Sequence, residues 1–82
     1  MSVRLKYVML PTPVGDWPVL FPENIQHRQA VDRLTVKPVS AGFCAVKRGV
    51  VTVFGESASL DLPSRPQDAA IIRDTLKLTE LL

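Results

Sequence analysis

Apolar and polar residues alternate along the first part of this chain, which is typical of strands with one buried face. Residues 3–10 alternate first and place Arg4 and Lys6 on the polar side. Residues 17–21 alternate again, after a turn rich in proline and glycine at residues 11–16. We therefore predict an N-terminal β-hairpin.

The stretch from residue 37 to residue 62 predicts three further strands. Residues 43–46 and 50–54 are apolar runs, and Gly49 between them suits a left-handed position in a tight turn. Residues 57–62 alternate after a second break at Gly55. Together these segments predict a three-stranded β-meander.

A first helical pattern follows the hairpin. His27 and Ala30 begin an apolar stripe that continues to Leu34 at helical spacing. Asn24 is a suitable N-cap. The pattern predicts a short helix from about Asn24 to Leu34.

A second helical pattern begins after Pro63. Ser64 and Gln67 have the spacing of a capping box, which predicts a helix start there. Its apolar residues form two overlapping stripes, and this is more apolar surface than one contact with a sheet requires. The stripes contain Ala69, Ile72 and Leu76, and Ile71, Thr75 and Leu78.

These elements predict an α+β fold in a single domain spanning residues 1–82. We expect an antiparallel sheet of about five strands, built from the hairpin and the meander, with two helices packed on it. Both helices are predicted to lie on one face.

Composition argues against disulfide-bonded and membrane proteins. The chain has 82 residues, a net charge of +2 and a single cysteine, so it forms no internal disulfide. A lone cysteine favours a reducing compartment, and we expect a cytoplasmic protein. No signal peptide and no apolar run of about 20 residues is visible, so no membrane association is expected.

Candidate catalytic groups are scattered along the chain. Residues 55–59 (Gly-Glu-Ser-Ala-Ser) resemble a nucleophile elbow only superficially, because the second glycine is missing and a strand follows. His27 lies on an apolar stripe and Cys44 in an apolar strand, so both are expected in the core. No glycine-rich phosphate loop occurs. We predict no enzyme, no catalytic, metal-binding or cofactor-binding residues, and no small-molecule substrate.

The wide apolar surface of the second helix favours a non-enzymatic protein-interaction module. The expected partner is a second copy of the chain, giving a homodimer, or a host protein. The candidate contact residues are Ile71, Thr75, Leu78 and Arg65. For Arg65 we weigh this role against pairing with Asp61 or Asp68.

The alternative function is nucleic-acid binding through basic residues. Lys47 and Arg48 lie at a predicted hairpin tip, and Arg28 and Arg33 lie on the first helix. Aromatic residues for stacking are few, and Phe43 and Phe54 lie in apolar runs, where core packing is the expected role.

Four segments also carry a resemblance over nearly the whole length. They are VRLKYVMLP (3–11), PVSAGF (38–43), FGESASL (54–60) and SRPQDAA (64–70). The chain resembles uncharacterised small proteins encoded in tailed phages and prophages of Gram-negative bacteria. The resemblance implies a phage accessory protein in the cytoplasm of a bacterial host, and it assigns no site residues.

Overall fold

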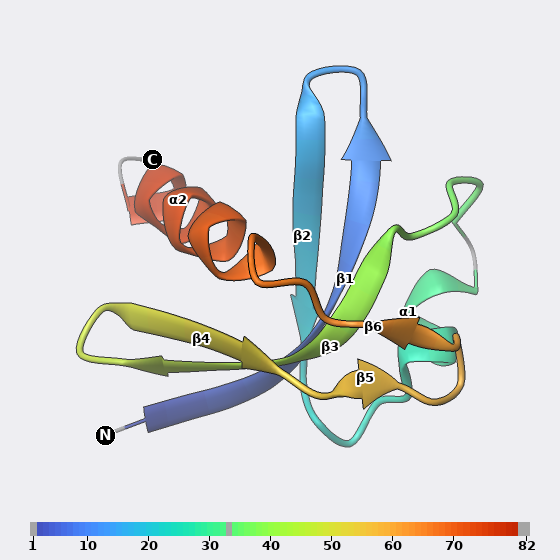
Figure 1. The fold of residues 1–82 in the computed structure, drawn as a ribbon, viewed down its shortest axis with the longest axis horizontal. Coiled ribbons are helices and arrows are strands. Elements are labelled where there is room, and N and C mark those ends of the chain that lie inside the picture. Colours follow the sequence, from blue (N-terminus) through green and yellow to red (C-terminus); the bar gives the residue numbers. More distant parts are fainter. Residues whose placement is uncertain (1, 33, 81–82) are drawn as a thin grey trace.

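The structure is a computed structural model that describes residues 2–32 and 34–80, with the side chains of residues 3–32 and 34–77. Six strands and two helices follow one another along these residues (Figure 1). They are β1 (Ser2–Thr12), β2 (Gly15–Phe21), α1 (His27–Val31), β3 (Ser40–Lys47), β4 (Val50–Phe54), β5 (Glu56–Ser57), β6 (Leu62–Pro63) and α2 (Asp68–Glu80).

Four strands form an antiparallel sheet in the order β2-β1-β3-β4. The predicted hairpins β1–β2 and β3–β4 are both confirmed. β1 is the long strand at the centre and pairs with β2 along one edge and with β3 along the other. Pro18 lies on the edge strand β2, where its missing N–H costs no ladder bond.

The α+β fold class is confirmed, but the helices lie on opposite faces of the sheet, so the prediction of one shared face is wrong (Figure 1). The cause is the alternation of β1. Its residues Tyr7 and Met9 point to one face and pack with Ile72 of α2, while Val8 between them points to the other face.

The second face is covered only in part. There α1 and the small β5–β6 sheet pack on Val8, Phe21 and Ala41, which are buried. The sheet therefore has a helix on one face and a mixed layer over part of the other.

The predicted third strand of the meander is wrong. Gly55 adopts φ +71° and turns the chain away after β4, so β5 and β6 pair only with each other. The turn between them is closed by the Leu60 N–H, which donates to the Ser57 hydroxyl at 3.2 Å. Within the segment 57–62, Leu60 and Leu62 pack on the core as the alternation suggested, but Ala58 is exposed and Ser57 is buried.

The helix boundaries also differ from the predictions. The chain before α1 forms a turn in which the Ile25 N–H donates to the Pro22 carbonyl, and Gln26 is extended. Gln26 therefore replaces Asn24 as the N-cap, and α1 ends before Leu34. Ala30 and Val31 face the core as expected.

The predicted capping box at α2 is wrong as well. The Ser64 hydroxyl donates to the Gly55 carbonyl at 2.8 Å instead of capping the helix. The first helical hydrogen bond runs from the Ile71 N–H to the Gln67 carbonyl. The helix consequently starts at Asp68, four residues later than Ser64.

Candidate nucleic-acid interface

The uncovered part of the second sheet face presents aromatic and basic side chains together. The register places Lys6, Phe43 and Phe54 in one row across β1, β3 and β4. The next row contains Arg4, Ala45 and Thr52, and the last contains Lys47 and Val50. We call this surface the aromatic–basic face, defined by Arg4, Lys6, Phe43, Ala45, Lys47, Val50, Thr52 and Phe54.

The two phenylalanines lie side by side on this face. Their ring centroids are 5.7 Å apart and the rings are nearly parallel, at 14°. Phe54 is 37% exposed, so the prediction that it packs in the core is wrong, whereas Phe43 is half-buried and packs against the buried His27 ring. The reason is the bend at Gly55, which leaves the β3–β4 end of the sheet without a covering layer.

Two cations stand over these rings. The Arg4 guanidinium carbon lies 5.6 Å from the Phe43 centroid and 5.1 Å from the Phe54 centroid. The Lys6 ammonium lies 5.7 Å from the Phe43 centroid. These distances are within the range of cation–π attraction. The positive charges are therefore held next to the aromatic surface.

The hairpin tip adds two further cations at the end of the face. Arg48 and Gly49 both have positive φ values, 52° and 78°, which is the geometry of a type I′ turn. The turn leaves Lys47 and Arg48 exposed. Beside Lys47, Ala45 and Thr52 line an open depression of about 420 Å³.

Acidic residues reduce this charge only in part. Arg4 is paired with Glu23, with 3.2 Å between Nε and Oε2. Lys6 donates to the Ile25 carbonyl at 2.9 Å, which uses one of its three N–H donors. Lys6, Lys47 and Arg48 are the cations of this region without a carboxylate partner among the described residues.

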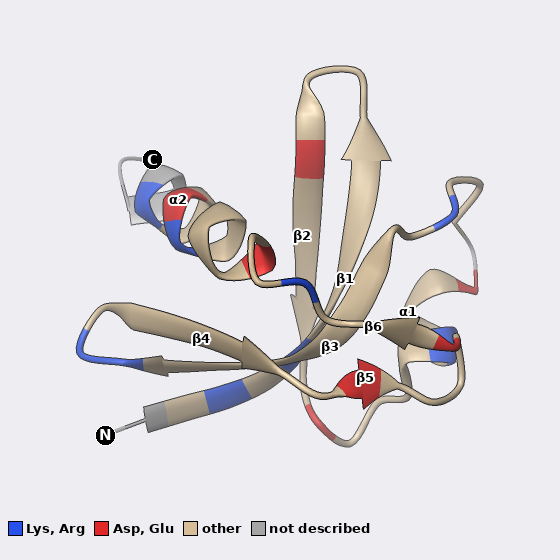
Figure 2. Ribbon diagram, in the orientation of Figure 1, with Lys and Arg blue, Asp and Glu red and all other residues tan. Residues whose placement is uncertain are grey.

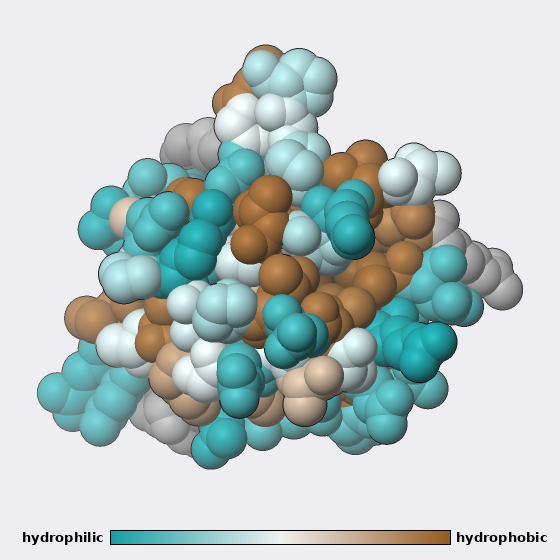
Figure 3. Space-filling model, turned by 45° about the vertical axis from the view of Figure 1, so that its right-hand side comes forward, coloured by the Kyte–Doolittle hydropathy of each residue, from teal (hydrophilic) through white to brown (hydrophobic). Residues whose placement is uncertain are grey.

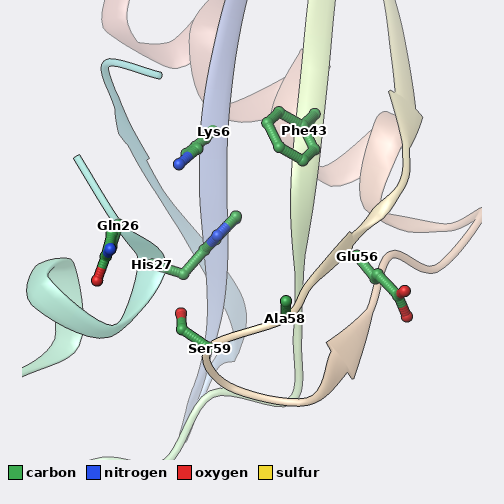
Figure 4. A pocket seen from close by; sticks show the side chains of 7 residues that line it. All are labelled: Lys6, Gln26, His27, Phe43, Glu56, Ala58 and Ser59. Carbon is green, nitrogen blue, oxygen red and sulfur yellow. The ribbon is translucent and has the colours of Figure 1, made fainter. Parts of the chain in front are cut away.

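A hollow of about 280 Å³ adjoins the face on the side of β5. Figure 4 shows its side chains, which come from β1, the start of α1, β3 and the β5–β6 region. Lys6 and Phe43 belong both to this hollow and to the aromatic–basic face. The lining residues are Lys6, Gln26, His27, Phe43, Glu56, Ala58 and Ser59.

His27 forms the inner wall of the hollow and is 4% exposed. Its Nε2 lies 2.8 Å from the Gly42 carbonyl, and since a carbonyl only accepts, Nε2 carries the proton. Burial, with a smaller contribution from the charge of Lys6, lowers the pKa of His27. The ring is therefore neutral, and it packs edge-on against Phe21 and Phe43.

A second polar cluster lies inside the core between α2 and the sheet. Asp68 is fully buried and accepts hydrogen bonds from Tyr7, Ser40 and Arg65. Arg65 also contacts Asp16 at 2.9 Å. Every buried polar side-chain atom of the described residues has a partner. The cluster joins the start of α2 to β1 and β3.

The structure places the described members of the predicted partner-binding set on α2 or just before it. Ile71 is half-buried and packs on the core, and Thr75 donates to the Ile71 carbonyl at 2.9 Å. Leu78 lies outside the described side chains. Arg65 pairs with Asp68, which confirms one of the two expected ion pairs. The exposed residues of the described part of α2 are Ala70, Arg73, Asp74 and Lys77, so its outer surface is mostly charged.

The predicted nucleic-acid contacts lie in separate parts of the molecule. Lys47 and Arg48 lie at the β3–β4 tip, whereas Arg28 lies on α1 at the other end of the molecule (Figure 2). Arg33 lies outside the described residues. Arg4 and Lys6 take the place of the α1 arginines next to the hairpin tip. Their alternation with apolar residues was a usable signal, but the pairing of β1 with β3 was not visible in the sequence.

Other site chemistries find no support in the described residues. Burial raises the pKa of the Cys44 thiol, which is fully buried as expected of a small core residue. The described part of the chain contains no cluster of three or more potential metal ligands. None of its helices is long and apolar enough to cross a membrane.

Comparison of the chain with protein families, with curated proteins and with solved structures found no match.

Proposed function

We propose that this protein binds single-stranded nucleic acid through the aromatic–basic face. The observation that carries the proposal is the partly exposed Phe43–Phe54 pair with Arg4 and Lys6 over its rings. Proteins that bind single strands combine aromatic rings, on which bases stack, with cations along the backbone. Both components occur here on three adjacent strands.

A single strand suits this surface better than a duplex. Bases stack on protein rings only when they are unstacked from each other, which a paired helix prevents. Reading a duplex requires an element that enters a groove. The aromatic–basic face is instead an open sheet surface, on which Arg4 and Lys6 lie over the ring pair and Lys47 and Arg48 lie at the hairpin tip.

Fluorescence anisotropy with a labelled decathymidylate tests the proposal. We expect Phe54→Ala to weaken binding about five-fold or more, because base–ring stacking contributes about 1–3 kcal/mol. Phe54→Tyr keeps the ring and should bind like the wild type. Trp17→Ala is the matched control, since Trp17 is an exposed aromatic residue away from the face.

Two results would count against this function. One is the absence of binding to decathymidylate or decauridylate at low salt. The other is equal weakening by Phe54→Ala and Trp17→Ala, which would mean that the Phe pair is not the contact surface. An unfolding curve for each variant separates a loss of fold from a loss of contact.

The second candidate function is protein binding. We place it on a surface other than the outer side of α2. Four apolar residues, each between 39 and 50% exposed, lie on β2 or in the segment that leads into β3. They are Trp17, Leu34, Val36 and Val39, and we call them the apolar end. Trp17 is the register partner of Leu10, and the Val39 N–H donates to the adjacent Met9 carbonyl.

Apolar surface of this kind favours contact with another chain. Figure 3 turns this side of the molecule forward and shows apolar surface between hydrophilic areas. A second copy of the chain is the simplest partner. In the phage setting that the sequence resemblance implies, a host protein is the other candidate.

Light scattering after size exclusion should then report a dimer at high micromolar concentration, which Val36→Glu converts to a monomer. A wild-type monomer at that concentration would count against the homodimer.

A further inference from the structure

We infer that the hollow beside the aromatic–basic face receives one unstacked base of the bound strand, with guanine as the preferred base. This inference rests on the proposed function and adds to it a position that distinguishes between bases. It begins from the two residues that the hollow and the face share, Lys6 and Phe43. A strand stacked on the Phe pair therefore passes the mouth of the hollow.

The hollow has a suitable size and wall for a base. Its volume is about 280 Å³, whereas an apolar cavity of about 150 Å³ holds a benzene ring. A fused two-ring purine thus has enough room. Phe43 and Ala58 supply apolar wall, and the buried His27 closes the bottom. The neutral His27 ring adds no charge to this wall.

The polar groups of the hollow favour bases that accept hydrogen bonds. Lys6 is the charged donor at its wall, and the Ile25 carbonyl takes only one of its three protons. Guanine offers two adjacent acceptors, O6 and N7, which lysine recognises. Adenine has an amino group in place of O6 and would direct a donor toward the ammonium.

Two neighbouring residues set the orientation of the base. Ser59 lies on the rim, where its hydroxyl accepts the Arg28 N–H at 3.2 Å and lies 3.4 Å from the Ser57 hydroxyl. Gln26 precedes α1 and brings an amide with both donors and acceptors. In Figure 4 Lys6, Gln26 and Ser59 surround the space beside His27, while the Glu56 carboxylate points away from it.

The test compares decathymidylates in which one central nucleotide is replaced by deoxyguanosine or by deoxyadenosine. We expect the strand with guanine to bind about five-fold or more tightly than the strand with adenine. Ala58→Phe fills the hollow and should abolish this difference while decathymidylate still binds. Ala70→Phe on α2 is the matched control, because Ala70 is also an exposed alanine. Lys6→Met should remove the preference without filling the hollow.

The outcomes separate this inference from the function on which it rests. If decathymidylate binds and depends on Phe54, but guanine and adenine strands bind equally, the inference is overturned and the proposed function stands. The same holds if Ala58→Phe leaves a guanine preference intact. No binding to any strand would overturn both.

Discussion

The Asp68 carboxylate accepts four hydrogen bonds although its side chain is fully buried. The Tyr7 hydroxyl donates at 2.6 Å and the Ser40 hydroxyl at 2.7 Å. The Arg65 N–H and Nε donate at 3.0 Å each. Burial acts to raise the pKa of Asp68, but these bonds outweigh it, so the pKa is lowered. One residue thus holds the start of α2 on two strands.

Asp68→Asn should destabilise the fold by about 3 kcal/mol. The substitution removes the buried carboxylate that pairs with Arg65, and it leaves buried donors without an acceptor. Urea unfolding followed by circular dichroism measures the change. The matched control is Asp74→Asn, since Asp74 makes an exposed ion pair with Arg73. Equal effects of the two substitutions would contradict a structural role for the Asp68 cluster.

The pH dependence of stability follows from two residues whose pKa is lowered by folding. His27 is held neutral, so protonation of the unfolded chain below about pH 6.5 favours unfolding. Asp68 is held ionised, so its contribution is complete above about pH 4 and is lost as the pH falls through its folded pKa. We expect unfolding midpoints to fall in two stages between pH 7 and pH 2. Asp68→Asn should remove most of the lower stage, and an unchanged acid limb would contradict this assignment.

The elements differ in how far the sequence could predict them. The strands β1 to β4 were predictable because period-two alternation and turn residues agree locally. The strand at residues 57–62 was not, because Gly55 takes a left-handed conformation that no local pattern distinguishes from a bulge. The candidate site depends on both this bend and the pairing of β1 with β3, which joins residues far apart in the chain. Arg4 and Lys6 were therefore visible as a polar face but not as neighbours of Phe43.

Gly55→Ala should be more destabilising than Gly49→Ala. Both residues have positive φ, 71° and 78°, so each alanine carries a similar backbone strain of about 1 kcal/mol. An added Cβ at Gly55 would lie 3.0 Å from Cδ1 of Phe43, whereas at Gly49 it meets nothing within 4 Å. The difference between the thermal unfolding midpoints of the two variants reports how tightly the bend at Gly55 packs against Phe43. A larger effect at Gly49 would contradict it.

The whole molecule presents one sheet with unequal faces. One face is covered by α2, and the other is covered by α1 and β5–β6 over part of its area. A net charge of only +2 gives no long-range attraction for an anionic polymer, so binding must come from the local grouping of cations and rings. The proposed binding surface therefore exists because α1 and β5–β6 leave that part of the sheet open.

Binding to a single strand should depend on salt with a slope of about −2 in a plot of log affinity against log salt concentration. This value follows from the three unpaired cations of the region, Lys6, Lys47 and Arg48, at about −0.7 per neutralised phosphate on a single strand. Lys47→Ala should make the slope shallower by about 0.7, whereas Lys77→Ala on α2 should not change it. A slope near zero would mean that the cations do not contact phosphates.

An NMR titration of the ¹⁵N-labelled protein with decathymidylate locates the contact surface directly. The account predicts that the largest amide shift changes fall on residues 4–6, 43–47 and 50–54, with small changes along α2. Changes confined to residues 34–39 or to α2, or no changes at millimolar strand concentration, would contradict binding at the aromatic–basic face.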